Sequence, residues 1–311
     1  MYEKLVNNME SIIIGKEKVL KRLLITLLSQ GHILIEDVPG VGKTTAAQAL
    51  AKSMDLSFNR VQFTPDLLPS DILGVSVYRR DTYDFVFKKG PIFNQIILAD
   101  EINRASPKTQ SSLLEAMEEG QVTIDGTTYA FDGPFMVIAT QNPIEYEGTF
   151  PLPEAQLDRF LMKIKIGYPD KSDEMKIVER MGTRRDIATL KTVLSADEVK
   201  AMQEAVKDVH ADDSIWAYIV DIVRKTRVSD EVILGCSPRA AVGLLIAAKA
   251  RAYINDRTYV IPEDVRDLAV DVLAHRLIVK PEIRYKGRGS ENIVKDLVEF
   301  VKVPKVVVHD E

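Results

Sequence analysis

The chain has 311 residues, of which 46% are hydrophobic and 28% charged, a composition typical of soluble globular proteins with one large or two modest domains. Its net charge of −5 provides no general attraction to nucleic acid, so a nucleic-acid partner would need a local basic patch. The single cysteine, Cys236, excludes an internal disulfide, and no apolar run has the length of a signal peptide core or a membrane span. We therefore expect a cytoplasmic protein without a membrane span.

The first half of the chain alternates predicted helices with short apolar strands. A polar N-terminal helix is followed by helical spacing of leucines up to Gln30, where Gly31 ends the pattern. A helix is also predicted from Lys43 and another over residues 107–119. Strands are predicted at residues 32–35, 58–63, 96–99, 135–139 and 160–166, and those at 96–99 and 135–139 are apolar throughout. Strands of this kind with helices between them predict a parallel sheet covered on both faces.

The second half of the chain is predicted to be mainly helical, and the change comes at residues 167–170, Gly-Tyr-Pro-Asp. Ser195 and Glu198 have the spacing of a capping box, and Pro262 suits the first turn of a helix. Between them, residues 240–253 are rich in alanine and leucine, and we expect a further short helix at 293–301. The sequence thus predicts an α/β domain over residues 1–168, followed by a helical domain and a C-terminal tail over residues 169–311.

A glycine-rich loop follows the first apolar strand and opens a helix, with the sequence Asp37-Val38-Pro39-Gly40-Val41-Gly42-Lys43-Thr44. Gly40 and Gly42 let the backbone N–H groups approach phosphates, and the start of the helix adds a positive dipole. Lys43 would reach the β- and γ-phosphates of a nucleotide, while the Thr44 hydroxyl would bind Mg²⁺. Asp37 departs from the strict phosphate-loop motif, which has glycine there. The alternative is a glycine-rich turn before an ordinary helix.

An acidic pair, Asp100-Glu101, ends the apolar run at residues 96–99. At the carboxyl end of a strand beside the phosphate loop, Asp100 can hold Mg²⁺ through water, and Glu101 can polarise the water that attacks the γ-phosphate. Taken alone, the pair could equally be a solvated strand end. The phosphate loop upstream favours the catalytic interpretation.

Three further polar residues complete the candidate site. Asn142 ends the next apolar strand, where its amide could bind both the γ-phosphate and the attacking water, although it could merely precede the turn-forming Pro143. Arg159 could meet the γ-phosphate of a neighbouring subunit, or could simply pair with Asp158. Arg239 begins a helix of the second domain and could reach back to the nucleotide, or be a solvated arginine in a first turn.

In this order and spacing, the segments resemble the AAA+ ATPases, and most closely the MoxR family. The resemblance spans residues 13 to about 275 and is carried by Ile13-Ile14-Gly15, Glu36 to Thr44, Leu98 to Arg104, Gln141-Asn142-Pro143, Glu154 to Phe160, and Ser237-Pro238-Arg239. By the same resemblance, aspartate is expected at the position of Asp37. The resemblance implies an αβα P-loop (AAA+) domain with a parallel sheet, followed by an all-helical lid domain.

The resemblance also implies roles for individual residues. Asp100 and Glu101 would be the Walker B pair, Asn142 sensor 1, Arg159 the arginine finger and Arg239 sensor 2. The catalytic residues would be Lys43, Glu101, Asn142, Arg159 and Arg239. Mg²⁺ would be bound by Thr44 and Asp100. The backbone of Ile13-Ile14-Gly15 would read adenine, so that ATP is bound by Ile14, Gly15, Pro39, Gly40, Val41, Gly42, Lys43, Thr44, Thr45 and Arg239.

The function implied by the resemblance is that of an ATP hydrolase using Mg²⁺ in a homo-hexameric ring. Relatives look like chaperones that mature or activate other protein complexes, often with von Willebrand factor A-domain partners. Hairpins at residues 75–89 and 121–131 are similar to an insertion and a pre-sensor 1 hairpin that face a pore or client, although each could simply cap the sheet.

Three other classes of function stay open at the level of the sequence. A nucleic-acid motor would be favoured by basic residues at the first hairpin, namely Arg79, Arg80, Lys88 and Lys89. The motor subunit of a metal chelatase resembles this architecture closely and would need dedicated partner subunits. A nucleotide-gated scaffold would bind ATP and scarcely hydrolyse it.

Overall fold

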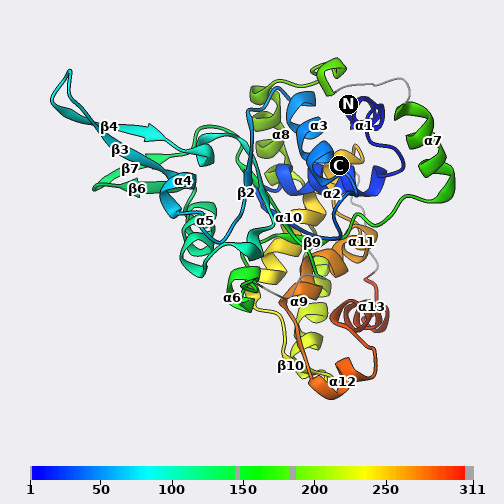
Figure 1. The fold of residues 1–311 in the computed structure, drawn as a ribbon. Helices are drawn as coiled ribbons and strands as arrows, with labels where there is room; N and C mark the ends of the chain where they lie inside the picture. The colour runs from blue at the N-terminus through cyan, green and yellow to red at the C-terminus, as the bar shows by residue number, and fades with distance from the viewer. Residues whose placement is uncertain (1, 144–147, 182–186, 305–311) are drawn as a thin grey trace. The chain divides into compact units, whose positions relative to one another are not determined.

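The computed structural model describes residues 2–143, 148–181 and 187–304. Contacts divide the chain into two compact units, residues 1–159 with 164–201, and residues 160–163 with 202–311 (Figure 1). The chain therefore crosses between the units three times, whereas the predicted domains meet once, between residues 168 and 169. The domain boundary stays a prediction.

The first unit contains most of the strands. Its elements are α1 (Tyr2–Glu10), α2 (Glu17–Leu28), β1 (Ile33–Glu36), α3 (Lys43–Ser53), β2 (Phe58–Gln62), α4 (Pro69–Leu73), β3 (Gly74–Arg79), β4 (Asp84–Lys89), η1 (Pro91–Phe93), β5 (Ile96–Asp100), η2 (Ile102–Arg104), α5 (Pro107–Glu119), β6 (Gln121–Ile124), β7 (Thr127–Ala130), β8 (Met136–Gln141), α6 (Glu154–Leu157), α7 (Lys171–Met181) and η3 (Ile187–Thr189). Two elements span a crossing, β9 (Met162–Ile164) and α8 (Ala196–Asp208).

Among the described residues the main sheet has five strands in the order β2-β5-β8-β1-β9. The pairs β2–β5, β5–β8 and β1–β8 are parallel, so the carboxyl ends of β1, β5 and β8 lie at the same edge. The residues of β5 from Ile96 to Ala99 are completely buried. Helix α3 packs on β2 and β5 and against α1 and α2. The prediction of an α/β fold with a parallel sheet is confirmed.

Local signals explain where the predicted helix over residues 107–119 begins and ends. Ser106 precedes the first turn and its Oγ accepts the backbone N–H of Thr109 at 3.4 Å, while Pro107 fills the first helical position. At the other end Gly120 takes the left-handed conformation, with φ +63°, that commonly ends a helix.

Both predicted hairpins are present, as β3–β4 and β6–β7. Asp125 and Gly126, with φ +50° and +79°, form the tight turn between β6 and β7 that the Asp-Gly signal predicts. Figure 1 shows the two hairpins side by side, and the rings of Phe87 and Tyr129 stack between them at 4.5 Å. Ring centroids 4.3 to 6.3 Å apart continue this contact into an aromatic run consisting of Phe87, Tyr129, Phe93, Phe131, Phe135 and His32.

The described part of the second unit consists mainly of helices packed on one another, with one short strand pair. Its elements are α9 (Asp213–Val228), β10 (Val232–Leu234), α10 (Pro238–Ile254), α11 (Pro262–Leu273), η4 (Ala274–Arg276), β11 (Ile278–Val279), α12 (Pro281–Tyr285) and α13 (Ser290–Phe300). Helices α10, α11 and α13 correspond to the helical segments predicted at 240–253, from 262, and at 293–301. In the capping box before α8, the Ser195 N–H donates to Glu198 Oε2 at 2.7 Å. Within the described residues, no helix is long and apolar enough to span a membrane.

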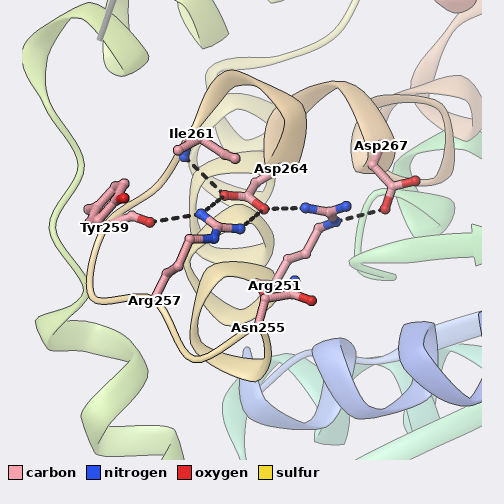
Figure 2. A network of polar contacts seen from close by, with 7 residues as sticks. All are labelled: Arg251, Asn255, Arg257, Tyr259, Ile261, Asp264 and Asp267. Carbon is pink, nitrogen blue, oxygen red and sulfur yellow. Dashed lines mark hydrogen bonds and ion pairs between the residues drawn. The ribbon is translucent and has the colours of Figure 1, made fainter. Parts of the chain in front are cut away.

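A buried carboxylate, Asp264, ties α10 and α11 together (Figure 2). Its side chain is fully buried and accepts from Arg257 Nη1 and Nη2 at 2.7 and 2.5 Å and from Arg251 Nη1. It also accepts the backbone N–H of Ile261 at 3.0 Å, one residue before α11 begins. Arg251 in turn donates to Asp267 at 2.8 Å. Two arginines thus share one carboxylate, which fixes the loop between the helices.

We expect Asp264→Asn to lower the free energy of unfolding of the second unit by about 3 kcal/mol, because removing one partner leaves guanidinium groups without their counter-charge. The single tryptophan, Trp216, lies in α9, so its fluorescence during urea unfolding reports on this unit. Asp267→Asn is the matched control and should cost below about 1 kcal/mol, since Asp267 is more exposed. An unchanged urea midpoint for Asp264→Asn would contradict the assignment.

Candidate functional site

The phosphate loop lies between β1 and α3, as predicted. Gly40 and Gly42 have φ of +87° and +93°, which favours glycine, and Gly42 immediately precedes α3. A Cβ added at either glycine would meet no atom within 4 Å, so the backbone faces open space at both positions. Thr44 and Thr45 lie in the first turn of α3. This arrangement fits a group of phosphates in front of a helix N-terminus.

Lys43 lies at the start of α3 and points back over the loop. Its ammonium group donates to the backbone carbonyl of Asp37 at 2.6 Å. Burial lowers the pKa of Lys43, and the nearby charges of Asp100, Asp37 and Glu101 partly oppose this shift. The two Walker B candidates therefore lie close enough to Lys43 to act on its charge, which brings the predicted phosphate and metal residues together.

Asp100 ends β5 and is almost buried, with two polar partners. Its Oδ1 accepts the Thr140 hydroxyl at 2.6 Å from the neighbouring strand β8. Its Oδ2 accepts from Arg60 Nη2 at 2.6 Å and Nε at 3.1 Å, so a guanidinium compensates the carboxylate charge. These contacts fix the carboxylate at the strand end.

Glu101 takes the left-handed conformation, with φ +58°, which is uncommon for a residue with a side chain. Its backbone N–H donates to Thr140 Oγ1 at 2.9 Å. Its carboxylate accepts from Gln62 Nε2 at 2.7 Å and pairs with Arg104 Nε at 3.2 Å. Glu101 thus combines an uncommon backbone conformation with two polar partners for its carboxylate.

Sequence reasoning missed the two residues of β2 that hold the acidic pair. Arg60 and Gln62 are two positions apart, so their side chains lie on the same side of the strand, and Arg60 Nη2 donates to Gln62 Oε1 at 2.9 Å. That bond turns the Gln62 amide so that its nitrogen faces Glu101. Arg60 and Gln62 alternate with Val61 in the sequence, but no local signal pairs their strand with the Walker B strand.

Asn142 directly follows β8 and is buried, at the same sheet edge as the acidic pair. Arg159 lies in the first unit, and its Nε pairs with Glu118 Oε2 at 2.7 Å. Its side chain is 27% exposed.

The remaining predicted residues are the expected adenine and loop residues and Arg239. Ile14 is half-buried and Gly15 exposed, both between α1 and α2. Pro39 is exposed and Val41 half-buried within the phosphate loop. Arg239 is exposed in the first turn of α10 and belongs to the second unit. The roles given to individual residues stay predictions.

Comparisons with known proteins agree on one family. Residues 32–162 match the ATPase family associated with various cellular activities (AAA), and residues 224–297 match the AAA lid domain. The chain is 51% identical to the uncharacterized protein YeaC of Bacillus subtilis, covering 97% of this chain and 94% of the relative. It is 41% identical to Chaperone MoxR1 of Mycobacterium tuberculosis, covering 98% and 82% respectively. The crystal structure of a candidate ATPase from Cytophaga hutchinsonii has a TM-score of 0.91 and 42% identity, covering 97% of this chain and 94% of that one.

Proposed function

Because this chain belongs to the MoxR family of AAA+ ATPases and is an ATP hydrolase, we propose that it works as a magnesium-dependent hexameric ring that remodels partner protein complexes. The observation that carries this proposal is the common sheet edge at which Lys43, the Asp100-Glu101 pair and Asn142 follow β1, β5 and β8. Ligands of parallel α/β sheets bind outside the carboxyl ends of the strands.

The residues at this edge fit a magnesium nucleotide. Magnesium prefers oxygen ligands and keeps several waters, and the Thr44 hydroxyl and the Asp100 carboxylate supply such oxygens. The open space beside Gly40 and Gly42 suits the phosphates. When bound, Mg²⁺-ATP supplies the phosphoryl group and a counter-charge for its transfer. Lys43 would then bind the β- and γ-phosphates.

Hydrolysis needs a positioned water beside the γ-phosphate. Glu101 would hold and polarise this water, and the Asn142 amide would orient it. Arg159 would act on the nucleotide of the neighbouring subunit, so turnover would require the ring. Loss of the γ-phosphate would release Asn142 and Arg239, and the lid would then move. We place this cycle in the cytoplasm.

The client would be a protein, by this proposal. At the first hairpin, Tyr83 and Phe85 are 82% and 67% exposed, and exposed apolar groups of this kind favour a protein contact. Among the basic residues there, Arg79 pairs with Asp81, and Lys89 lies over the ring of Phe93 at 5.0 Å. Two of the four basic residues are thus engaged by neighbouring side chains, and with the exposed rings beside them we favour a protein client over nucleic acid. A partner with a von Willebrand factor A domain would fit the family.

We expect Lys43→Ala to weaken ATP binding by roughly 100-fold or more, because an ammonium group that contacts phosphates cannot be replaced by water without loss. Titration with a fluorescent ATP analogue in the presence of Mg²⁺ measures the affinity. Lys108→Ala removes an exposed lysine from α5 and should bind as the unchanged chain does. Tight binding by Lys43→Ala would remove Lys43 from its role.

A further inference from the structure

The aspartate that departs from the phosphate-loop motif has a defined set of partners. The Asp37 carboxylate is buried and accepts three backbone N–H groups. Oδ1 accepts from Val38 at 2.8 Å, and Oδ2 accepts from Ile166 at 2.7 Å and Gly167 at 2.5 Å. Asp37 therefore ties the phosphate loop to a segment about 130 residues further along the chain.

The same segment is also held by Lys16, through its carbonyl groups. The Lys16 ammonium donates to three consecutive backbone carbonyls at 2.9 to 3.1 Å, those of Ile166, Gly167 and Tyr168. We call residues 166–168 the clamped segment. Lys16 directly follows Gly15, where an added Cβ would lie 1.7 Å from Asp173 Oδ2 in the first turn of α7. The N-terminal segment is thus packed closely against the chain beyond the clamped segment.

The clamped segment has a special place in the course of the chain. Residues 160–163 belong to the second unit, and the chain returns to the first unit at residue 164. The clamped segment begins two residues later. One side chain from the phosphate loop, and one directly after the segment expected to read adenine, therefore fix the chain where it re-enters the first unit.

We propose that Asp37 is a positioning residue that, with Lys16, couples nucleotide binding to the clamped segment. The link runs through Lys43, whose ammonium donates to the Asp37 carbonyl at 2.6 Å. When the Lys43 ammonium binds the phosphates of a nucleotide, its hydrogen bond to the Asp37 carbonyl is lost. Asp37 is also the residue whose carboxylate accepts the Ile166 and Gly167 N–H groups, so this loss can alter those contacts. The inference rests on the proposed function, because it needs a nucleotide at the loop.

Hydrogen exchange of the Ile166 and Gly167 amides in the full chain tests the coupling, with and without Mg²⁺-ATP. In the unchanged chain, ATP should alter the exchange of these two amides. Asp37→Gly restores the strict motif but removes all three acceptor contacts. We expect it to speed their exchange roughly tenfold or more without nucleotide, to abolish the response to ATP, and to weaken ATP binding roughly tenfold.

Asp37→Asn keeps the shape of the side chain but offers one oxygen to three donors, so we expect an intermediate effect. This variant also keeps the test possible if Asp37→Gly does not fold. Asp55→Gly is the matched control. Asp55 is exposed, already has φ +51°, and should leave the exchange and the ATP affinity unchanged. If the unchanged chain binds no ATP, the proposed function fails. If it binds ATP and the exchange of Ile166 and Gly167 does not change, or if both Asp37 variants keep the same ATP response, the coupling alone is overturned.

Discussion

Replacing Arg159 with alanine should lower the ATPase rate of the assembled chain by about 10³- to 10⁵-fold, the range known for an arginine supplied across an interface. Mixing Arg159→Ala with Lys43→Ala subunits should restore part of the rate. At some interfaces of a mixed ring, the arginine of a Lys43→Ala subunit faces an intact Lys43. Phosphate release, measured over a range of mixing ratios, gives the rate.

The ion pair between Arg159 and Glu118 provides the control for this experiment. Glu118→Gln removes the partner charge within the chain and keeps the arginine, so this variant should remain active. Arg159→Lys keeps a positive charge without the planar fork and should recover little of the rate. If mixed rings of the expected mass form and no activity returns, Arg159 does not act across the interface.

Replacing Glu101 with glutamine should lower the turnover number by about 10²- to 10⁴-fold while ATP still binds with nearly unchanged affinity. The amide has almost the same shape as the carboxylate and can still receive the Gln62 donor. It cannot polarise or deprotonate a water as a carboxylate does. Single-turnover hydrolysis and equilibrium nucleotide binding, measured on the same preparation, separate these two effects.

A glutamate of α5 offers the matched control, because Glu115 is exposed. Glu115→Gln makes the same chemical change away from the candidate site and should keep the full rate. Near-normal turnover by Glu101→Gln would rule out Glu101 as the residue that activates water.

Much of the fold was predictable because its signals are local. Each strand of the main sheet lies where one was predicted, and Asp125-Gly126 marks its hairpin through two residues alone. The phosphate loop was equally local, since glycines, lysine and threonine follow one another. The sequence shows that Asp37 departs from the phosphate-loop motif. Two of the N–H groups that donate to its carboxylate belong to Ile166 and Gly167, which are far away in the sequence and could not be predicted.

The partners of the acidic pair were not predictable for the same physical reason. Arg60 contacts Asp100 because β2 pairs with β5. The residues of these two strands do not by themselves indicate that the strands are neighbours. Glu118 as the partner of Arg159 likewise depends on how α5 packs. Local chemistry indicates which groups react, whereas tertiary packing decides which groups hold them.

The aromatic run connects the two hairpins to the main sheet. It starts at the stacked rings of Phe87 and Tyr129 and ends at Phe135 and His32, which immediately precede β8 and β1. His32 Nδ1 accepts the Val137 N–H at 3.0 Å, so the last ring is bonded into the sheet itself. A force applied to the hairpins would therefore reach the amino ends of β8 and β1 through these rings. The carboxyl ends of the same two strands lead to Asn142 and to the phosphate loop. Strands β1 and β8 therefore connect the hairpin contacts at one end to the candidate site at the other.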